Sequence, residues 1–132
     1  MDAARLETLP LFAGLDEAQR TAVAESVREV KIPAGERLAT QGEFAYDFFV
    51  IEQGRAEIRR GGDLVATVGE GDVVGEIGLL LTGTRTASII ATQPTTVVAM
   101  FTREFKRLEK QVPELAERLR ATVRERMAGA AR

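Results

Sequence analysis

The spacing of hydrophobic and polar positions changes twice along the chain and divides it into three segments. Residues 1–29 carry helical signals, and residues 30–101 hold short apolar runs separated by glycine-rich turns. From residue 102 onward the apolar positions return to helical spacing. Short runs that recur every roughly 8 to 12 residues are typical of an antiparallel barrel, roll or sandwich. The pattern therefore predicts one domain over residues 1–132, mainly β, with helices on both sides of the strands.

The N-terminal segment begins with a turn and continues into a helix. Residues 8–15 mix a proline and a glycine with large apolar side chains, which favours a packed helical turn over a flexible tail. Asp16 is a suitable N-cap, and Gln19 stands three residues later, where a capping box has its second member. We expect a helix over residues 17–27. Its inner face is expected to hold Ala18, Ala22, Val23 and Val27.

The middle segment contains six runs with the composition of strands. Glycine, proline and acidic residues separate them, as turns require. The runs are 30–32, 48–51, 56–59, 64–68, 86–91 and 95–101. Ile58 and Val68 lie where apolar residues alternate with polar ones, so each is expected to face the interior.

The C-terminal segment predicts two helices. Thr102 can cap a helix that runs through Leu108, and Pro113 fits the first turn of the next. Apolar residues of this last helix recur every four positions, a spacing that drifts around the helix, whereas a long coiled coil needs an average of 3.5. We therefore expect a helix laid on its own domain. The recurring residues are Leu115, Leu119, Val123 and Met127.

Composition excludes several classes of function. The chain has 132 residues and contains neither cysteine nor histidine, so zinc sites, iron–sulfur clusters and the usual haem sites lack their preferred ligands. Catalysis by a cysteine or histidine pair is absent for the same reason. No apolar run approaches the roughly 18 residues of a membrane span, and the N-terminus has no signal-peptide pattern. We expect a cytoplasmic protein that is not an enzyme and holds no metal or prosthetic group.

Charge is unevenly distributed. The net charge is −2, which argues against general nucleic-acid binding. Residues 1–101 carry 9 basic and 15 acidic side chains, whereas residues 102–132 carry 9 basic and 5 acidic ones. The basic segment is interpreted either as a solvated helix of mixed charge or as a contact surface for an acidic partner.

The stretch over residues 74–87, V-G-E-I-G-L-L-L-T-G-T-R-T-A, carries the candidate chemistry. Glu76 follows a glycine, and Arg85 comes nine residues later. A guanidinium can pair bidentately with phosphate oxygens, and a carboxylate accepts a hydrogen bond from a sugar hydroxyl. The apolar run between them is too short for a helix that stands alone. This layout is expected of a pocket that holds a sugar hydroxyl at one end and a phosphate at the other.

The stretch resembles the phosphate-binding cassette of cyclic nucleotide-binding domains, which reads Gly-Glu-apolar-Ala/Gly-Leu, a spacer, and Arg-Ser/Thr-Ala. Three further pieces are similar to that family in the same order along the chain: its N-terminal helical motif, its central strand pair, and the turn that leads to the cassette. They are Pro10-Leu11-Phe12-x-Gly14-Leu15, then Gly42-Glu43 with Asp47-Phe48-Phe49-Val50-Ile51 and Gly54, then Gly69-Glu70-Gly71-Asp72. The resemblance covers roughly residues 9 to 127 and implies an antiparallel, jelly-roll-like β-roll with N-terminal helices and two C-terminal helices.

The resemblance also implies a ligand and the residues that bind it. Arg85 and Thr86 would hold a cyclic phosphate, and Glu76 would accept from the ribose 2′-hydroxyl. Glycines let the backbone approach a ligand closely, and a short helix near residue 78 would direct backbone N–H groups at the anion. The implied ligand-binding residues are Gly75, Glu76, Ile77, Gly78, Leu79, Arg85, Thr86, Ala87 and Ile58. For Ile58 the alternative is core packing. For Arg85 we expect a surface position, so that its removal leaves the fold intact.

The base and the output stay open. Thr86 is compatible with cAMP or cGMP, and we expect cAMP. The residue over the purine would lie near 127–131, with Arg124 or Arg126 as substitutes. The expected role is a regulatory sensor whose C-terminal helices move on binding and signal to a fused domain or a partner. Direct DNA or membrane binding by this chain is not expected, and dimerisation through the last helix stays open. The alternative function is an interaction module of the same fold that binds no nucleotide.

Overall fold

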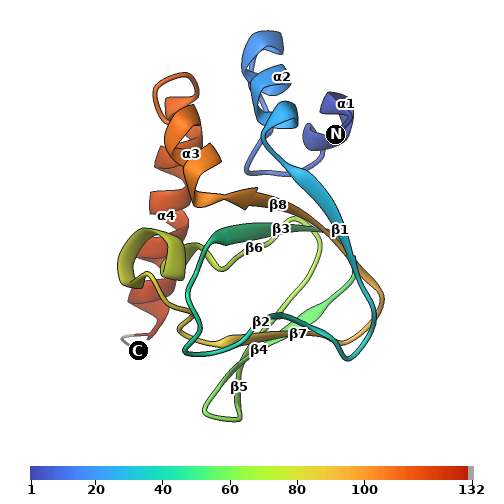
Figure 1. Ribbon diagram of the computed structural model, residues 1–132, viewed down its shortest axis with the longest axis vertical. Helices are drawn as coiled ribbons and strands as arrows, with labels where there is room; N and C mark the ends of the chain where they lie inside the picture. The colour runs from blue at the N-terminus through green and yellow to red at the C-terminus, as the bar shows by residue number, and fades with distance from the viewer. Residues whose placement is uncertain (131–132) are drawn as a thin grey trace.

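The computed structural model describes residues 1–130, apart from the side chains of Leu79 and of residues 127–130. Two four-stranded antiparallel sheets face each other, and helices from both ends of the chain cover one of them (Figure 1). The covered sheet has the order β1-β8-β3-β6, and the other has the order β2-β7-β4-β5. This arrangement confirms the predicted β-roll with N-terminal helices and two C-terminal helices.

The elements have the following bounds. The strands are β1 (Arg28–Ile32), β2 (Arg37–Ala39), β3 (Asp47–Gln53), β4 (Ala56–Arg60), β5 (Asp63–Val68), β6 (Val73–Val74), β7 (Ser88–Ala91) and β8 (Thr95–Phe101). The helices are α1 (Ala3–Leu6), α2 (Glu17–Glu25), the π-helix η1 (Gly78–Thr82), α3 (Thr102–Leu108) and α4 (Pro113–Ala130). β2 and β6 were not predicted, because segments of three and two residues are too short to show an alternating pattern.

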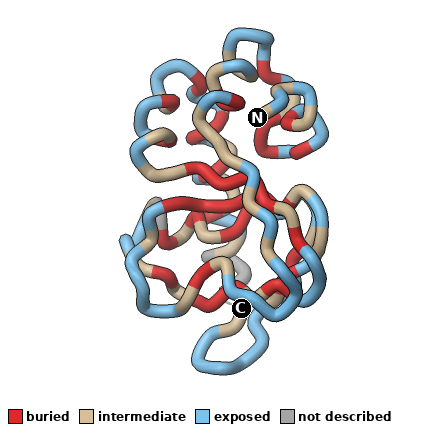
Figure 2. Tube along the Cα trace, turned by 45° about the vertical axis from the view of Figure 1, so that its right-hand side comes forward, coloured by how far each residue is buried: buried red, intermediate tan, exposed pale blue. Residues whose placement is uncertain are grey.

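β3 is apolar without interruption because both of its faces are buried. Phe48 and Val50 pack in the core beneath the helices, whereas Phe49 and Ile51 pack in the core between the two sheets. A strand that is covered on both faces has no solvent face on which polar residues would alternate. Figure 2 shows the resulting buried positions along both sheets. The pocket described below opens from the end of the inter-sheet core.

The capping box at α2 is confirmed. Asp16 Oδ1 accepts from the backbone N–H of Gln19 at 2.8 Å, and Gln19 Oε1 accepts from the Asp16 N–H at 3.2 Å. The helix ends at Glu25, two residues earlier than expected, because Ser26 caps it and β1 starts soon after. The predicted inner face was wrong for Ala18, which is exposed. The buried residues of α2 are Val23 and Ala24.

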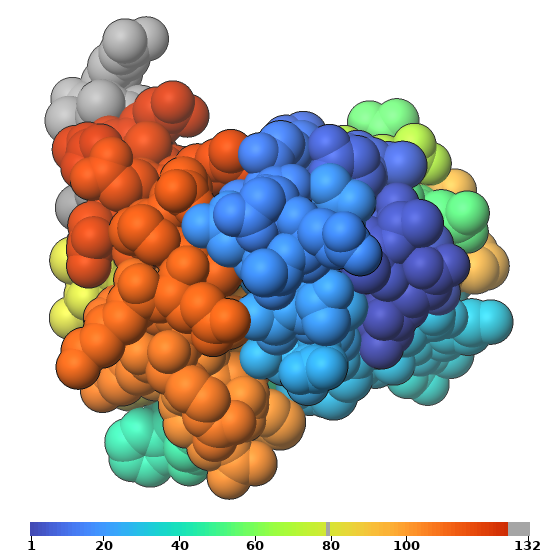
Figure 3. All heavy atoms as spheres, turned by 90° about the horizontal axis from the view of Figure 1, so that it is seen from above, coloured from blue at the N-terminus to red at the C-terminus, as the bar shows by residue number. Residues whose placement is uncertain are grey.

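The C-terminal helices follow the prediction except at one cap. Thr102 is the first residue of α3 rather than its N-cap, and its hydroxyl donates to the carbonyl of Tyr46 at 3.0 Å. Pro113 begins α4, as expected. Leu115, Leu119 and Val123 are buried, and the side chain of Met127 lies outside the described ones. α4 therefore packs on its own domain, beside the N-terminal helices (Figure 3).

An arginine of α4 holds the N-terminal turn. Arg118 Nη1 donates to the carbonyls of Pro10, Leu11 and Ala13, at 3.3, 3.0 and 2.7 Å. The contact fixes the turn over residues 8–15 against the helix. Within residues 1–130, no helix combines the length and the apolar character that crossing a bilayer requires.

Candidate functional site

A pocket of about 780 Å³ lies between the β4–β5 hairpin, the cassette over residues 74–87 and the end of α4. Pockets that hold small molecules range from about 300 to 1,000 Å³, so the volume suits a nucleotide-sized ligand. One wall is apolar, and the rest carries three arginines and one glutamate. The lining residues are Ile58, Arg60, Val65, Ala66, Val68, Gly75, Glu76, Ile77, Gly78, Leu81, Thr82, Arg85, Thr86, Ala87, Ile89 and Arg126.

Glu76 is fully buried at the inner end of this pocket. Its Oε1 accepts from Arg126 Nη1 at 2.5 Å, whereas its Oε2 is buried and accepts no hydrogen bond within the described structure. Burial raises the pKa of the Glu76 carboxyl, and the charge of Arg126 opposes that rise. One oxygen of the carboxylate is thus engaged, and the other lacks a donor.

Arg85 is buried rather than exposed, which corrects the surface position expected from the sequence. Its Nη2 lies 2.6 Å from Asp47 Oδ1, and its Nη1 donates to the Asp47 carbonyl at 2.9 Å. Asp47 Oδ2 in turn accepts from Arg28 Nη2 at 2.8 Å. The carboxylate of Asp47 therefore binds two guanidiniums. One of them is the guanidinium of Arg85, which Asp47 fixes in position at the wall of the pocket. Glu76 and Arg85 are not paired with each other.

Two glycines of the cassette stand where no side chain fits. Gly75 has a φ of +84°, and a Cβ on it would lie 2.7 Å from Arg85 Nη1. A Cβ on Gly78 would lie 2.9 Å from the Cβ of Ala45 and from the carbonyl oxygen of Thr84. The first glycine is needed for its conformation and for the approach of the arginine. The second lets η1 pack against the loop that precedes β3.

The other predicted site residues lie around the same space. Ile77, Thr86, Ala87 and Ile58 all line the pocket, and the carbonyl of Thr86 accepts from Arg60 Nε at 3.2 Å. Ile58 packs against the inter-sheet core as well, so both roles that the sequence left open are compatible with its position. The side chain of Leu79 lies outside the described ones. The fold thus gathers the described members of the predicted set at one pocket.

α4 reaches the pocket through Arg126. Besides its ion pair with Glu76, its Nη2 donates to the carbonyl of Val73. Arg124, the other candidate weighed from the sequence, is exposed and does not line the pocket. Arg118 and Arg126 are eight residues apart, about 12 Å along the helix. α4 is thereby tied to the N-terminal turn near its start and to the cassette near its end.

Sequence reasoning missed Asp47 and Arg60 as members of the site. A signal for Asp47 exists, because an acidic residue that begins a fully apolar strand needs a buried partner. No local pattern identifies that partner, since Asp47 and Arg85 are 38 positions apart. Arg60 follows Ile58 at the alternation of a strand, which places both side chains on one face of β4.

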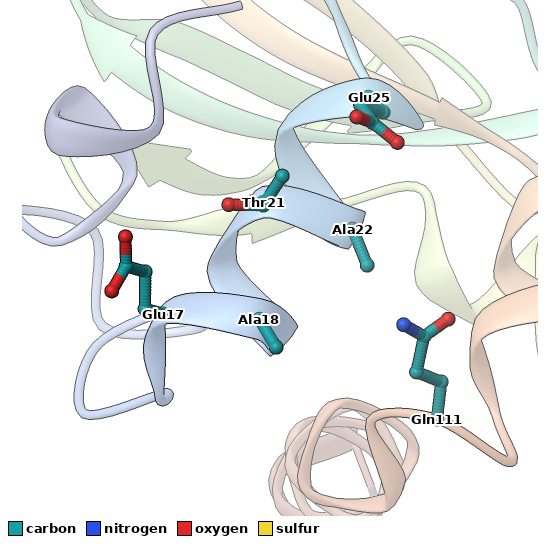
Figure 4. A pocket seen from close by; sticks show the side chains of 6 residues that line it. All are labelled: Glu17, Ala18, Thr21, Ala22, Glu25 and Gln111. Atoms are coloured by element: carbon teal, nitrogen blue, oxygen red, sulfur yellow. The ribbon is translucent and has the colours of Figure 1, made fainter.

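A second hollow, of about 580 Å³, lies between α2 and the turn that joins α3 to α4. Figure 4 shows side chains of α2 on one side and Gln111 on the other. It contains none of the cassette residues and is lined mainly by small and acidic side chains. We therefore take the pocket at the cassette as the candidate site.

Known proteins are similar to this chain in sequence and in fold. The family model of the cyclic nucleotide-binding domain matches residues 29–111. The cAMP-dependent protein kinase regulatory subunit of Mycosarcoma maydis is 34% identical over 122 residues, which cover 86% of this chain and 23% of that protein. A cyclic nucleotide-gated potassium channel of Rhizobium etli is 29% identical over 121 residues, or 92% of this chain and 34% of the channel.

A solved structure is also similar to this chain in fold. The catabolite activator protein of Thermus thermophilus superposes with a TM-score of 0.82 at 28% identity, over 92% of this chain and 60% of that one. The first curated relatives are longer than this chain, which spans between 21% and 34% of their length.

Proposed function

Because the chain belongs to the cyclic nucleotide-binding domain family, we propose that it binds a 3′,5′-cyclic nucleotide at the cassette and acts as a regulatory sensor. The observation that carries the proposal is the buried Oε2 of Glu76, which has no donor. An unsatisfied buried acceptor costs about 1–3 kcal/mol, and more when it is charged. A ribose 2′-hydroxyl in the pocket supplies the missing donor.

The phosphate binds at Arg85. Arg85 provides a guanidinium whose position is set by Asp47, so little side-chain entropy is lost when an anion arrives. Thr86 adds a hydroxyl beside it. The pocket contains three arginines and one glutamate, and this excess of positive charge favours a ligand with one negative charge.

The base lies against the apolar wall that Ile58, Val68 and Ile89 form. We propose cAMP rather than cGMP as the ligand. Support comes from the relatives, since the Mycosarcoma maydis protein and others at similar identity are regulatory subunits of cAMP-dependent kinases. Thr86 permits both bases and does not decide between them.

The response to the ligand runs through α4. Arg126 donates to Oε1 of Glu76, and the ribose 2′-hydroxyl would donate to Oε2, so α4 and the ligand share one carboxylate. A ligand that binds better when α4 has moved shifts the equilibrium by its difference in affinity between the two states. A ligand of micromolar affinity has about 8 kcal/mol of binding free energy to divide between contact and rearrangement. The repositioned C-terminal helices would signal to a fused domain or a protein partner, or to a second copy through α4.

The test is a thermal unfolding comparison of the protein alone and with cAMP, cGMP or 5′-AMP. A ligand at 100 times its dissociation constant adds about 2.7 kcal/mol, which raises the midpoint by about 5 to 10 °C at this chain length. We expect such a shift with cAMP, a smaller one with cGMP and none with 5′-AMP. For the ribose contact, Glu76→Gln is compared with wild type on cAMP and 2′-deoxy-cAMP. The loss should be large for cAMP and small for the deoxy ligand.

A second function is favoured by one observation. Both candidate anchors form ion pairs within the protein, Arg85 with Asp47 and Glu76 with Arg126, so neither charge depends on a nucleotide for its partner. Such internal pairs are expected of an interaction module of the same fold. The absence of a midpoint shift with any cyclic nucleotide would refute the sensor and favour this module.

A further inference from the structure

Arg60 lies at the rim of the pocket with an arrangement that suits ligand contact. It ends β4, and because side chains alternate along a strand it shares the pocket face with Ile58. Its Nε donates to the Thr86 carbonyl at 3.2 Å, which places the guanidinium beside the segment assigned to the phosphate. The bond uses one of its five N–H groups. Both Nη groups are without a partner among residues 1–130.

The other two guanidiniums of the pocket are committed to carboxylates. Arg85 pairs with Asp47, and Arg126 pairs with Glu76. Arg60 forms no ion pair within the part of the chain that the structure describes. Asp63 stands opposite Arg60 in the β4–β5 hairpin, but the two residues form no ion pair there. Arg60 is therefore the arginine of the pocket whose guanidinium is not held by a carboxylate, and it can meet an incoming anion.

Arg59, the residue before Arg60, is an arginine that does not face the pocket. Arg59 lies on the opposite face of β4, where its Nη2 is 3.0 Å from Glu57 Oε1 and its Nη1 donates to the Gly62 carbonyl at 2.9 Å. It does not line the pocket. Arg59 and Arg60 differ by one position and one strand face, so they form a matched pair for substitution.

We propose that Arg60 is a second phosphate-binding arginine of this pocket, an inference that rests on the proposed function. A cyclic phosphate has two exocyclic oxygens. Arg85, held by Asp47 at the inner wall, serves one of them, and Arg60 donates to the other from the rim. Because Arg60 is exposed, it meets the phosphate first and increases the rate of association. The two arginines approach from different sides and so distinguish the two oxygens.

The test compares wild type, Arg60→Gln and Arg59→Gln by calorimetry with three ligands: cAMP and the Rp and Sp diastereomers of its phosphorothioate. Each diastereomer replaces a different exocyclic oxygen by sulfur. We expect Arg60→Gln to weaken cAMP about tenfold, as loss of a charge-assisted hydrogen bond at a partly solvated site does. It should also change the ratio of the Rp and Sp affinities by at least about threefold. Arg59→Gln, with the same change of charge, should alter neither quantity.

Each result decides the proposal. If wild type binds cAMP and Arg60→Gln binds all three ligands as wild type does, the role of Arg60 is refuted and the proposed function stands. If Arg60→Gln weakens the affinity for all three ligands equally and leaves the Rp/Sp ratio unchanged, a direct contact between Arg60 and one phosphate oxygen is refuted. The variant would then have lost only the long-range attraction of a positive charge. If wild type binds no cyclic nucleotide, the proposed function itself fails. The unfolding midpoint of ligand-free Arg60→Gln should match wild type, since the side chain is exposed.

Discussion

Arg85→Ala should destabilise the ligand-free protein, which is the opposite of what a surface arginine would do. The substitution removes the partner of Asp47, whose side chain is 12% exposed, while that of Arg85 is 6% exposed. Breaking a buried ion pair costs about 3–5 kcal/mol, because a charge is left buried without compensation. Asp47 keeps its second partner, Arg28, so we expect the lower cost of about 2–3 kcal/mol. At this chain length the unfolding midpoint falls by about 4 to 12 °C.

The assay is urea unfolding followed by circular dichroism, without any ligand. Arg85→Ala, Asp47→Ala and the double variant complete a double-mutant cycle, which isolates the energy of the pair from that of each side chain. We expect a coupling of at least about 1 kcal/mol, because Arg85→Ala leaves Asp47 with Arg28 alone and Asp47→Ala leaves the buried Arg85 without a carboxylate, whereas the double variant removes both buried groups and leaves only the partly exposed Arg28. A loss below about 0.5 kcal/mol for Arg85→Ala, or additive single losses, would show that the pair adds no stability. The reasoning from burial would then be wrong whatever the protein binds.

Three further predictions concern the same pocket. Burial raises the pKa of the Glu76 carboxyl above its ordinary value of 4.5. The folded protein therefore binds the carboxyl proton more tightly than the unfolded chain does. The stability that this proton contributes is lost as the pH rises from 4.5 through the raised pKa. The free energy of unfolding of wild type minus that of Glu76→Gln should therefore decrease as the pH rises above 4.5, and a constant difference contradicts the shift. Gly75→Ala should lower the free energy of unfolding by about 2 kcal/mol or more, and Gly61→Ala should lower it less in the same urea assay. Both glycines have a positive φ, but only a Cβ at position 75 would collide with Arg85. Arg126→Met should lower the free energy of unfolding by about 1–2 kcal/mol, less than the loss of a fully buried pair, because the Arg126 side chain is 29% exposed. It should also speed amide hydrogen exchange at the end of α4 relative to α3. Unchanged exchange rates would mean that the ion pair with Glu76 does not hold the helix.

Local signals in the sequence determined the elements that depend on near neighbours. The capping box joins Asp16 to Gln19, three residues apart, so its chemistry can be read from the chain itself. Turn residues and alternation located the six longer strands, although β1, β3, β4 and β5 extend by one or two residues at an end beyond the predicted runs and β7 begins two residues later than predicted. The cassette residues were close in sequence, and their match to the pattern of a known family, rather than their spacing alone, pointed to a phosphate and a sugar hydroxyl as the groups to be bound.

Tertiary structure alone decided which charges meet. Asp47 reaches Arg85 across 38 positions, and Arg126 reaches Glu76 across 50. β6, with only two residues, exists because β3 offers its edge, and Ala18 is exposed because the core cluster lies beneath the opposite side of α2. The reason is physical. Helix caps and strand alternation follow from backbone geometry within a few residues, whereas a buried ion pair depends on where the packing of distant elements leaves an uncompensated charge, and no local pattern contains that information.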